Sequence, residues 1–198
     1  MFMLIRNLLI CFCCLLAACS QHIKYKNPHV KIETGEGDIE LELYPDQAPK
    51  TVAAFLSYVD SGYYVNSNFY RVWNDDNQAI DAYKARLIQG GIWETNHKLV
   101  MSLPGIPHET TAQTGIQHIN GVISLARGKP GTASTEFFIC VGNQHGFDYG
   151  GKNNTDGLGY AAFGRVVKGM EVVIRIYRDP EKDEYFDPPI ALFNIVRM

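Results

Sequence analysis

The stretch that decides the fold reads VKIETGEGDIELEL and spans residues 30–43. Apolar and polar residues alternate on both sides of a turn at residues 35–37, and this period of two is typical of strands that bury one face. The glycines of the turn match a hairpin connection. We therefore predict a β-hairpin in which Ile39, Leu41 and Leu43 point into a core.

Outward from this hairpin, many short apolar runs predict strands, and only two segments predict helices. Val52, Phe55 and Val59 recur at helical spacing after Pro49, and Gly62 follows the last turn. The second helical pattern covers residues 170–176, and the runs that predict strands cover residues 69–72, 87–89, 121–126, 136–141, 161–167 and 190–196. Because strands and helices do not alternate, the pattern favours a closed antiparallel barrel or sandwich over a doubly wound sheet.

Length and composition fit one globular domain and exclude several classes of protein. The chain has 198 residues, of which 46% are hydrophobic and 20% are charged, and its formal net charge is -3. The apolar fraction is too high for an intrinsically disordered chain, and the negative charge argues against a general nucleic-acid binder. We assign the domain to residues 30–198, with insertion-like loops at residues 73–84 and 146–159.

The start of the chain has the pattern of an export signal. A basic residue precedes an apolar run at residues 8–16, which is shorter than the ~20 residues that span a bilayer. The run leads into LAAC at residues 16–19, which resembles the bacterial lipobox; a plain secretion signal is the alternative. The resemblance implies a signal peptide at residues 1–18, a diacylglyceryl thioether and an N-acyl chain on Cys19, and a tether over residues 19–29.

Lipidation at Cys19 would anchor the protein in the bacterial cell envelope, on the periplasmic side. Ser20 follows the cysteine in place of an aspartate, which favours the outer membrane over the inner one. Apart from Cys19, only Cys140 remains after removal of the signal peptide, so we expect no internal disulfide and no cysteine-bound metal. Cys140 lies in an apolar run and is predicted to be a buried, unreactive thiol.

The common catalytic and metal-binding motifs are absent from the sequence. It contains no Walker loop, no Gly-x-Ser-x-Gly and no His-Glu-x-x-His. The histidines outside the start of the chain stand at spacings that match no metal site; they are His97, His108, His118 and His145. We therefore predict neither a metal nor a cofactor.

Seven segments, in order along the chain, carry a family resemblance. They read GDIELELYP at 37–45, APKTVAAF at 48–55, FYRV at 69–72, IQGG at 88–91, GVISLAR at 121–127, STEFFI at 134–139 and AFGRVVKGM at 162–170. Together they resemble the cyclophilin family of peptidyl-prolyl cis/trans isomerases, in its bacterial form. The resemblance covers residues 30–198 and implies a mainly β fold, an eight-stranded antiparallel barrel capped by two helices.

The chemistry of this family requires no covalent bond to be broken, because the enzyme only twists an X-Pro amide against its resonance. The uncatalysed barrier is ~18–20 kcal/mol. By the resemblance, Arg71 donates a hydrogen bond to the proline nitrogen, which becomes an acceptor as the amide loses conjugation. Gln89 binds the substrate backbone and helps to orient the arginine. Phe138 lines the proline pocket, while Phe137, on the opposite face of the same strand, fills the core.

The resemblance also implies a set of further substrate-binding residues. Ala126 and Arg127 would offer an extended edge that binds the substrate through backbone hydrogen bonds. The remaining members of the set line or border the pocket; they are Leu87, Glu136, Phe147 and Tyr160.

One departure from the family pattern concerns the pocket floor. Arg86 stands where a pocket phenylalanine is usual. The insertion at residues 73–84 can shift the register between this sequence and the family pattern, or it can supply Trp73 or Tyr83 in place of the phenylalanine.

Two further departures concern charge and inhibitor binding. Glu136 replaces a usual glutamine, and its carboxylate is expected to pair with Arg71 or Arg127. Gly146 occupies the place of the tryptophan associated with tight cyclosporin binding, so we expect weak inhibition at best.

The leading hypothesis is a membrane-anchored peptidyl-prolyl isomerase that acts on unfolded or extended exported polypeptides, whose folding slow X-Pro exchange can limit. We expect a monomer with no nucleic-acid partner. One alternative is a peptide-binding or chaperone-like envelope lipoprotein with little catalysis, motivated by Arg86; another is a scaffold lipoprotein whose insertions bind an envelope partner. The combination of Arg71, Gln89 and Phe138 favours the isomerase, because a binding module has no need of a donor aimed at the proline nitrogen.

Overall fold

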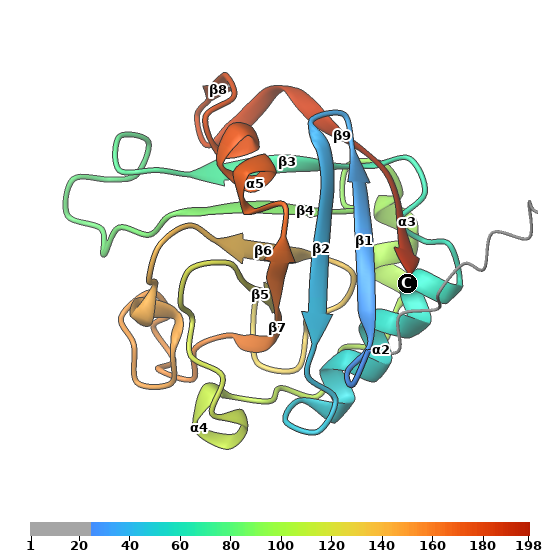
Figure 1. Cartoon of the computed structure of the whole chain (residues 1–198). Coiled ribbons are helices and arrows are strands. Elements are labelled where there is room, and N and C mark those ends of the chain that lie inside the picture. The colour runs from blue at the N-terminus through green and yellow to red at the C-terminus, as the bar shows by residue number, and fades with distance from the viewer. Residues whose placement is uncertain (1–24) are drawn as a thin grey trace, which may run out of the picture.

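The computed structural model of the chain describes residues 25–198, which form a mainly β domain (Figure 1). The predicted signal peptide and Cys19 lie outside the described residues. The strands are β1 (His29–Thr34), β2 (Gly37–Leu43), β3 (Ser67–Trp73), β4 (Leu87–Gly91), β5 (Val122–Leu125), β6 (Phe137–Cys140), β7 (Ala161–Lys168), β8 (Glu181–Lys182) and β9 (Tyr185–Arg197).

The strands form one antiparallel sheet that closes on itself. Their order is β1-β2-β7-β5-β6-β4-β3-β9-β8, and β1 also pairs with β9. Eight strands therefore make a closed barrel, while β8 pairs only with β9 and lies outside it. This arrangement confirms the predicted mainly β barrel.

The predicted hairpin is confirmed as β1 and β2. Ile32 of β1 stands opposite Ile39 of β2, and the side chains of Ile39, Leu41 and Leu43 are fully buried. Gly37 at the turn has a φ of +126°, in a backbone region that residues with a side chain rarely adopt. The barrel begins one residue before the predicted start of the domain.

Both predicted helices are present. α2 (Pro49–Asp60) and α5 (Met170–Tyr177) lie near opposite ends of the β1–β2 hairpin, and each buries an apolar face against the barrel (Figure 1). Three short helical elements were not predicted: α3 (His97–Ser102), α4 (Thr111–Thr114) and the 3-10 helix η2 (His145–Phe147). They are too short for a helical period to be read from the sequence.

The barrel interior holds the main hydrophobic core, and Phe137 lies near its centre. The ring centroid of Phe137 is 6.0 Å from that of Phe55, 5.8 Å from Tyr64 and 5.7 Å from Phe69. All four rings are fully buried. Tyr64 keeps its hydroxyl satisfied by donating a hydrogen bond to the carbonyl of Thr135.

A second, smaller apolar cluster lies on the outer side of β4 and β6. It consists of Ala85, Leu87, Phe138, Cys140 and Phe147, all buried. Alternation along each strand explains the division, because successive side chains point to opposite faces. Burial raises the pKa of the Cys140 thiol, which agrees with the predicted unreactive role. The outer cluster supplies the floor of the site described below.

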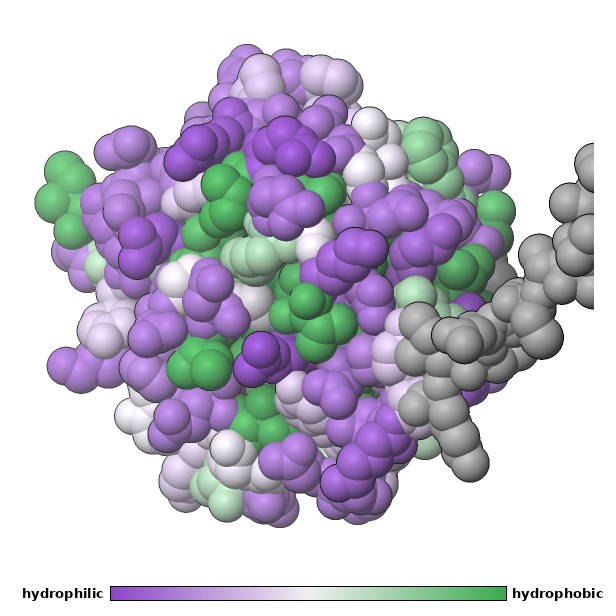
Figure 2. Space-filling model, in the orientation of Figure 1, coloured by the Kyte–Doolittle hydropathy of each residue, from purple (hydrophilic) through white to green (hydrophobic). Residues whose placement is uncertain are grey.

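The face shown in Figure 2 is mostly hydrophilic, with single apolar side chains scattered over it. Within residues 25–198, no helix combines the length and the apolar character needed to cross a membrane.

Candidate active site

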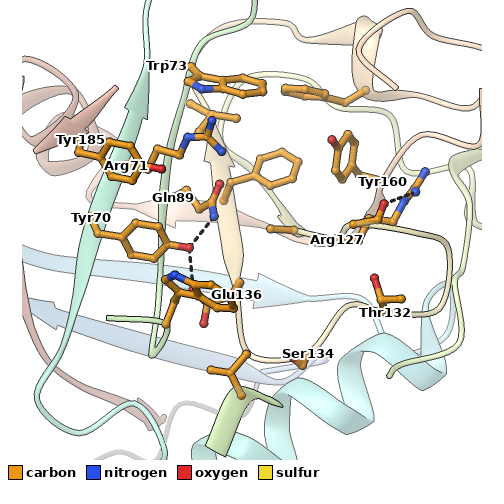
Figure 3. Close-up of a pocket in the computed structure, with 17 residues that line it drawn as sticks. Tyr70, Arg71, Trp73, Gln89, Arg127, Thr132, Ser134, Glu136, Tyr160 and Tyr185 are labelled. Atoms are coloured by element: carbon orange, nitrogen blue, oxygen red, sulfur yellow. Dashed lines mark hydrogen bonds between the residues drawn. The ribbon is translucent and has the colours of Figure 1, made fainter. Parts of the chain in front are cut away.

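A pocket of about 380 Å³ opens over the outer apolar cluster. Figure 3 shows Arg71 and Trp73 on one side of it and Arg127 and Tyr160 on the other. The pocket brings together every residue for which a catalytic or substrate-binding role was predicted: Arg71, Leu87, Gln89, Ala126, Arg127, Glu136, Phe138, Phe147 and Tyr160.

The floor of the pocket is aromatic and tightly packed. The ring of Phe138 lies 5.1 Å from that of Phe147 and 5.4 Å from that of Tyr160, between centroids. Leu87 completes this apolar surface from β4. Phe137 points the other way, into the barrel, so the structure places the two adjacent phenylalanines as expected. The floor has the size and character to receive a small apolar ring.

A buried polar network holds the floor from behind. His118 stacks on Phe138 with 6.0 Å between ring centroids and is fully buried. Its Nδ1 lies 2.8 Å from Oδ1 of Asp148, and its Nε2 lies 3.0 Å from the hydroxyl of Ser124. Because burial lowers the pKa of His118, the neutral ring donates from Nδ1 to the carboxylate and accepts from the serine. Both ring nitrogens are hydrogen-bonded, so the imidazole is fixed in the position in which it packs against Phe138.

None of the four histidines belongs to a metal cluster within the described part of the chain. No group of three or more His, Cys, Asp or Glu side chains there has a geometry that could hold a metal ion. His118 and His145 instead share the carboxylate of Asp148, and His97 packs against the ring of Trp93.

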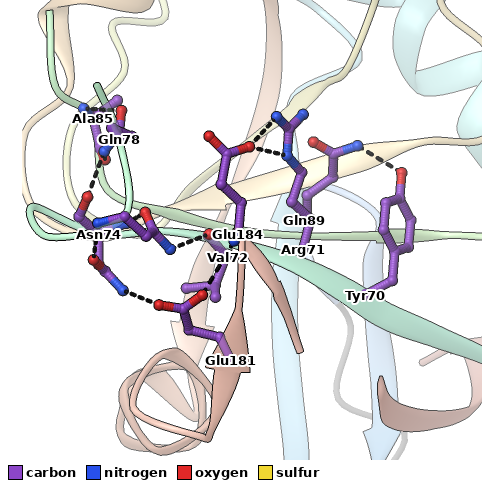
Figure 4. A network of polar contacts seen from close by, with 10 residues as sticks. Tyr70, Arg71, Val72, Asn74, Gln78, Ala85, Gln89, Glu181 and Glu184 are labelled. Carbon is purple, nitrogen blue, oxygen red and sulfur yellow. Dashed lines mark hydrogen bonds and ion pairs between the residues drawn. The ribbon is translucent and has the colours of Figure 1, made fainter. Parts of the chain in front are cut away.

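Arg71 stands at the rim of the floor and is held by three neighbours. Its Nε and Nη2 lie 3.2 Å and 2.5 Å from Oε2 of Glu184, in the turn between β8 and β9 (Figure 4). The guanidinium carbon is 4.7 Å from the ring centroid of Trp73 and 5.9 Å from that of Tyr185. Gln89 stands opposite Arg71 in the β3–β4 register, so both side chains reach the pocket from adjacent strands.

Gln89, Tyr70 and Glu136 form a chain of hydrogen bonds beside Arg71. Nε2 of Gln89 donates to the Tyr70 hydroxyl over 2.6 Å, and that hydroxyl donates to Oε2 of Glu136 over 2.8 Å (Figure 3). Oε1 of Glu136 accepts from the Ile92 amide and the Thr135 hydroxyl. Because the amide nitrogen of Gln89 is bound to Tyr70, the orientation of the amide group is fixed beside the pocket.

The expected ion pair of Glu136 with Arg71 or Arg127 does not form. The carboxylate of Glu136 accepts a hydrogen bond from Tyr70 instead. Arg71 is bound to Glu184. Both oxygens of Asp156 accept hydrogen bonds from the guanidinium of Arg127, at 2.7 and 2.9 Å. The carboxylate of Glu136 is therefore bound by Tyr70, and the two arginines are bound by Glu184 and Asp156.

Arg127 fastens the insertion at residues 146–159 to the rim of the pocket. In addition to Asp156, its guanidinium binds the carbonyl of Gly159, and its side chain is only 1% exposed. The hydrogen bonds from Arg127 and then from the Leu158 amide lower the pKa of Asp156 to about 2. The side chain of Arg127 is fully engaged, so a substrate would meet it through the backbone. The N–H of Ala126 is likewise occupied, by the carbonyl of Glu136.

Trp73, and not Arg86, completes the pocket wall. Trp73 lines the pocket and stacks on Phe147 with 6.4 Å between ring centroids. Arg86 is exposed and its guanidinium lies against Gly142, outside the pocket. Tyr83 also lies outside the pocket. The observation that motivated a non-catalytic alternative, a charged residue in the pocket floor, is therefore absent.

The two insertions contact each other beside the pocket. The side-chain amide of Asn153 donates to the carbonyl of Tyr83, and Nζ of Lys152 lies 6.0 Å from the centroid of the Tyr83 ring. A side chain at Gly146 would collide with Oδ1 of Asn153 and with the ring of Tyr83. A tryptophan at this position, which the resemblance implied for the family, would require Asn153 and Tyr83 to move.

Sequence reasoning missed several lining residues, and Tyr70 is the most informative of them. It belongs to the quoted FYRV segment, but β3 has an irregularity in its register between Phe69 and Arg71. Phe69 is in the barrel core, whereas both Tyr70 and Arg71 line the pocket, so simple alternation fails at this point. The other missed lining residues come from loops, a short helix and the start of β9: Trp93, Val100, Gly128, Thr132, Ser134 and Tyr185.

The burial of Glu136 gives a testable pH dependence. Burial raises the pKa of this carboxyl above its ordinary value of 4.5, more than the hydrogen bond from Tyr70 lowers it. The folded state therefore holds the proton more tightly than the unfolded state, and this contribution to stability is lost as the pH rises from 4.5 through the raised pKa.

Replacing Glu136 with glutamine removes the titrating carboxyl group. The variant Glu136→Gln should therefore not show the loss of stability that Glu136 causes as the pH rises. The difference in the free energy of unfolding, variant minus wild type, should increase as the pH rises above 4.5 and then level off. Urea unfolding at a series of pH values measures this difference, and the comparison cancels the other titrating groups. A difference that stays constant with pH would show that Glu136 keeps its ordinary pKa.

Comparisons with known proteins agree with the geometry of the site. The family described as cyclophilin type peptidyl-prolyl cis-trans isomerase/CLD matches residues 29–198. The peptidyl-prolyl cis-trans isomerase A of Dickeya dadantii is 36% identical over 149 residues, covering 75% of this chain and 70% of the relative. The peptidyl-prolyl cis-trans isomerase B of Escherichia coli is 34% identical over 148 residues, covering 74% and 82%.

A solved structure shows the same fold. The crystal structure of a cyclophilin-type isomerase from Cryptosporidium parvum aligns with a TM-score of 0.66 and 24% identity, over 86% of this chain and 97% of the other. With the barrel, the pocket and the family match together, the chain belongs to the cyclophilin-type peptidyl-prolyl cis-trans isomerase family.

Proposed function

We propose that this chain catalyses the cis/trans exchange of X-Pro bonds in unfolded or extended polypeptides, with Arg71 as the donor to the proline nitrogen. The observation that carries the proposal is a single one. A guanidinium, fixed by Glu184 and flanked by two aromatic rings, stands at the rim of an apolar pocket whose floor is Phe138.

The apolar floor and the guanidinium act on different parts of the same amide. The floor receives the proline ring and removes water from it, which favours the less polar, twisted amide. As the C–N bond twists, the nitrogen loses its conjugation and gains a lone pair that accepts a hydrogen bond. A donor fixed at that point binds the twisted amide more tightly than either planar isomer, and this difference lowers the barrier.

Gln89 and Tyr70 support this step by fixing polar groups next to the pocket. With its nitrogen bound to Tyr70, Gln89 presents its amide oxygen as an acceptor for a backbone N–H of the substrate. The pocket of about 380 Å³ has polar lining residues beside its apolar floor, and we expect these to contact the residues that flank the proline.

The experiment that tests this function measures exchange directly. A short peptide with an Ala-Pro bond gives separate NMR signals for its cis and trans isomers, because they interconvert over tens of seconds or more without a catalyst. Adding the full-length protein in a mild non-ionic detergent should accelerate exchange between the two signals at catalytic concentrations. Binding of the peptide by folded protein without any acceleration would replace the isomerase with a peptide-binding module.

The cellular setting that we propose is the periplasmic side of the bacterial envelope, with lipid-modified Cys19 as the anchor and exported polypeptides as substrates. The lipobox-like LAAC sequence supports this setting. The barrel starts at His29, and a tether from residue 19 reaches ~30 Å if extended, so the anchored domain has room to meet its substrates.

Replacing the anchoring cysteine tests this setting. In cells, Cys19→Ser is expected to move the protein from the membrane fraction to the soluble fraction and to abolish its labelling by radioactive palmitate. Cys14→Ser, the same change five positions earlier, is the matched control and should leave both unchanged. Palmitate labelling that persists in Cys19→Ser would contradict the anchor.

A further inference from the structure

Glu184 is held in place by the backbone of the turn between β8 and β9. Its carbonyl accepts a hydrogen bond of 2.8 Å from the amide of Val72, the residue after Arg71. Its own amide donates to Oε2 of Glu181 over 3.1 Å. Glu184 has a φ of +72°, and Asp183 before it has a φ of +54°, so the turn is tight. The backbone of Glu184 is therefore fixed beside β3, and its side chain extends from this fixed position toward Arg71.

The carboxylate of Glu184 binds only one edge of the Arg71 guanidinium. One oxygen, Oε2, accepts from both Nε and Nη2, at 3.2 and 2.5 Å. A guanidinium has five N–H donors, and Glu184 uses two of them. The other three have no hydrogen-bond partner among residues 25–198. They are free to donate to a bound peptide.

The aromatic rings of Trp73 and Tyr185 also restrict the movement of the guanidinium. Its central carbon lies 4.7 Å from the Trp73 centroid and 5.9 Å from the Tyr185 centroid. The side chains of Arg71 and Glu184 are 28% and 27% exposed, so water also reaches the pair. Without the carboxylate, a long and partly exposed arginine side chain would sample many rotamers.

We infer that Glu184 is a positioning residue, which fixes the guanidinium of Arg71 so that its free N–H groups face the proline nitrogen. The inference rests on the proposed function, since Arg71 must act as the donor. A donor that is already oriented requires no rearrangement when the amide twists, and the benefit appears in the transition state. Glu184 does not touch the substrate in this role.

The test compares Glu184→Gln with Asp183→Asn. Both changes remove one negative charge from the same turn, but Asp183 is exposed and does not contact Arg71. Glu184→Gln should lower kcat about tenfold, less than the ~100-fold that a misplacement of 1 Å can cost. KM should stay within about twofold, because the lost interaction acts in the transition state. Asp183→Asn should leave both unchanged.

A double variant separates positioning from other effects. In an Arg71→Ala background, Glu184→Gln should cause no further loss, because there is no guanidinium left to orient. An equal loss in that background, or unchanged activity in the single variant, overturns the inference. Increased activity in Glu184→Gln also overturns it, since the carboxylate would then be competing with the substrate.

An NMR measurement makes the inference independent of the activity assay. The Arg71 Nε–H signal should exchange slowly with water in the wild type and faster in Glu184→Gln, with no change in Asp183→Asn. Equal exchange in all three proteins overturns the inference. If the wild type shows slow exchange of this proton but no acceleration of X-Pro exchange, the proposed function fails while the arrangement of Arg71 and Glu184 stands. All experiments use the full-length protein in detergent.

Discussion

Replacing Arg71 with alanine is expected to lower kcat/KM for X-Pro exchange by ~10²–10³, the range observed when a fixed transition-state donor is removed. The apolar floor would still bind proline, so the affinity for the peptide should change much less than the rate. Since Arg71 and Glu184 are both partly exposed, water can replace their ion pair, and the fold should remain intact.

The measurement is the exchange rate of an Ala-Pro peptide by NMR, at several peptide concentrations. Arg165→Ala is the matched control, because it removes the same charge from an exposed position on β7 that does not line the pocket. The control should keep full activity. If Arg71→Ala were as active as the control, the donor role would be wrong and the apolar floor alone would have to account for catalysis.

The second large effect is a loss of stability, and it should differ between the adjacent residues Phe137 and Phe138. Phe137→Ala is expected to lower the free energy of unfolding by ~3–5 kcal/mol, since it leaves a cavity at the centre of the barrel core. Phe138→Ala removes a ring that faces the pocket, so water can fill part of the space and the loss of stability should be smaller. Its main effect should be on activity, a loss of ~10- to 100-fold in kcat/KM, because the apolar contact with proline disappears.

Urea unfolding followed by circular dichroism gives the two stabilities, and the peptide exchange assay gives the two activities. The decisive result is a difference in kind between the two variants. Phe137→Ala should be the less stable of the two but should be active while it is folded. Phe138→Ala should be more stable than Phe137→Ala but should have impaired activity. If Phe138→Ala kept full activity, the proline ring would bind elsewhere.

Local patterns in the sequence were sufficient to predict the elements that depend on residues close together along the chain. The alternation in residues 30–43 predicted the hairpin with its inward residues Ile39, Leu41 and Leu43, and the helical spacing after Pro49 predicted α2. The closure of the sheet joins β1 to β9 across almost the whole described chain, and no local pattern predicts such a pairing. The pattern of short strands left a barrel and a sandwich open as alternatives, and the family resemblance implied the barrel.

The site was predicted residue by residue where the family motifs supplied the positions, as for Arg71, Gln89 and Phe138. The bonds between residues were not predicted. Arg71 and Glu184 are 113 positions apart, and the contact depends on a turn that the sequence did not show. Glu136 binds Tyr70 because the irregular register of β3 turns Tyr70 toward the pocket, which the alternation rule does not anticipate.

The pairing of β1 with β9 determines when the molecule can finish folding. β1 is the first strand of the domain to be synthesised and β9 the last, and a hydrogen bond of 3.1 Å joins Met198 to His29. Until β9 has left the ribosome, the edge of β1 that pairs with it has no partner in the sheet. Such edges promote aggregation. Closure of the barrel therefore depends on the arrival of β9, and until then the unpaired edge of β1 can pair with another chain.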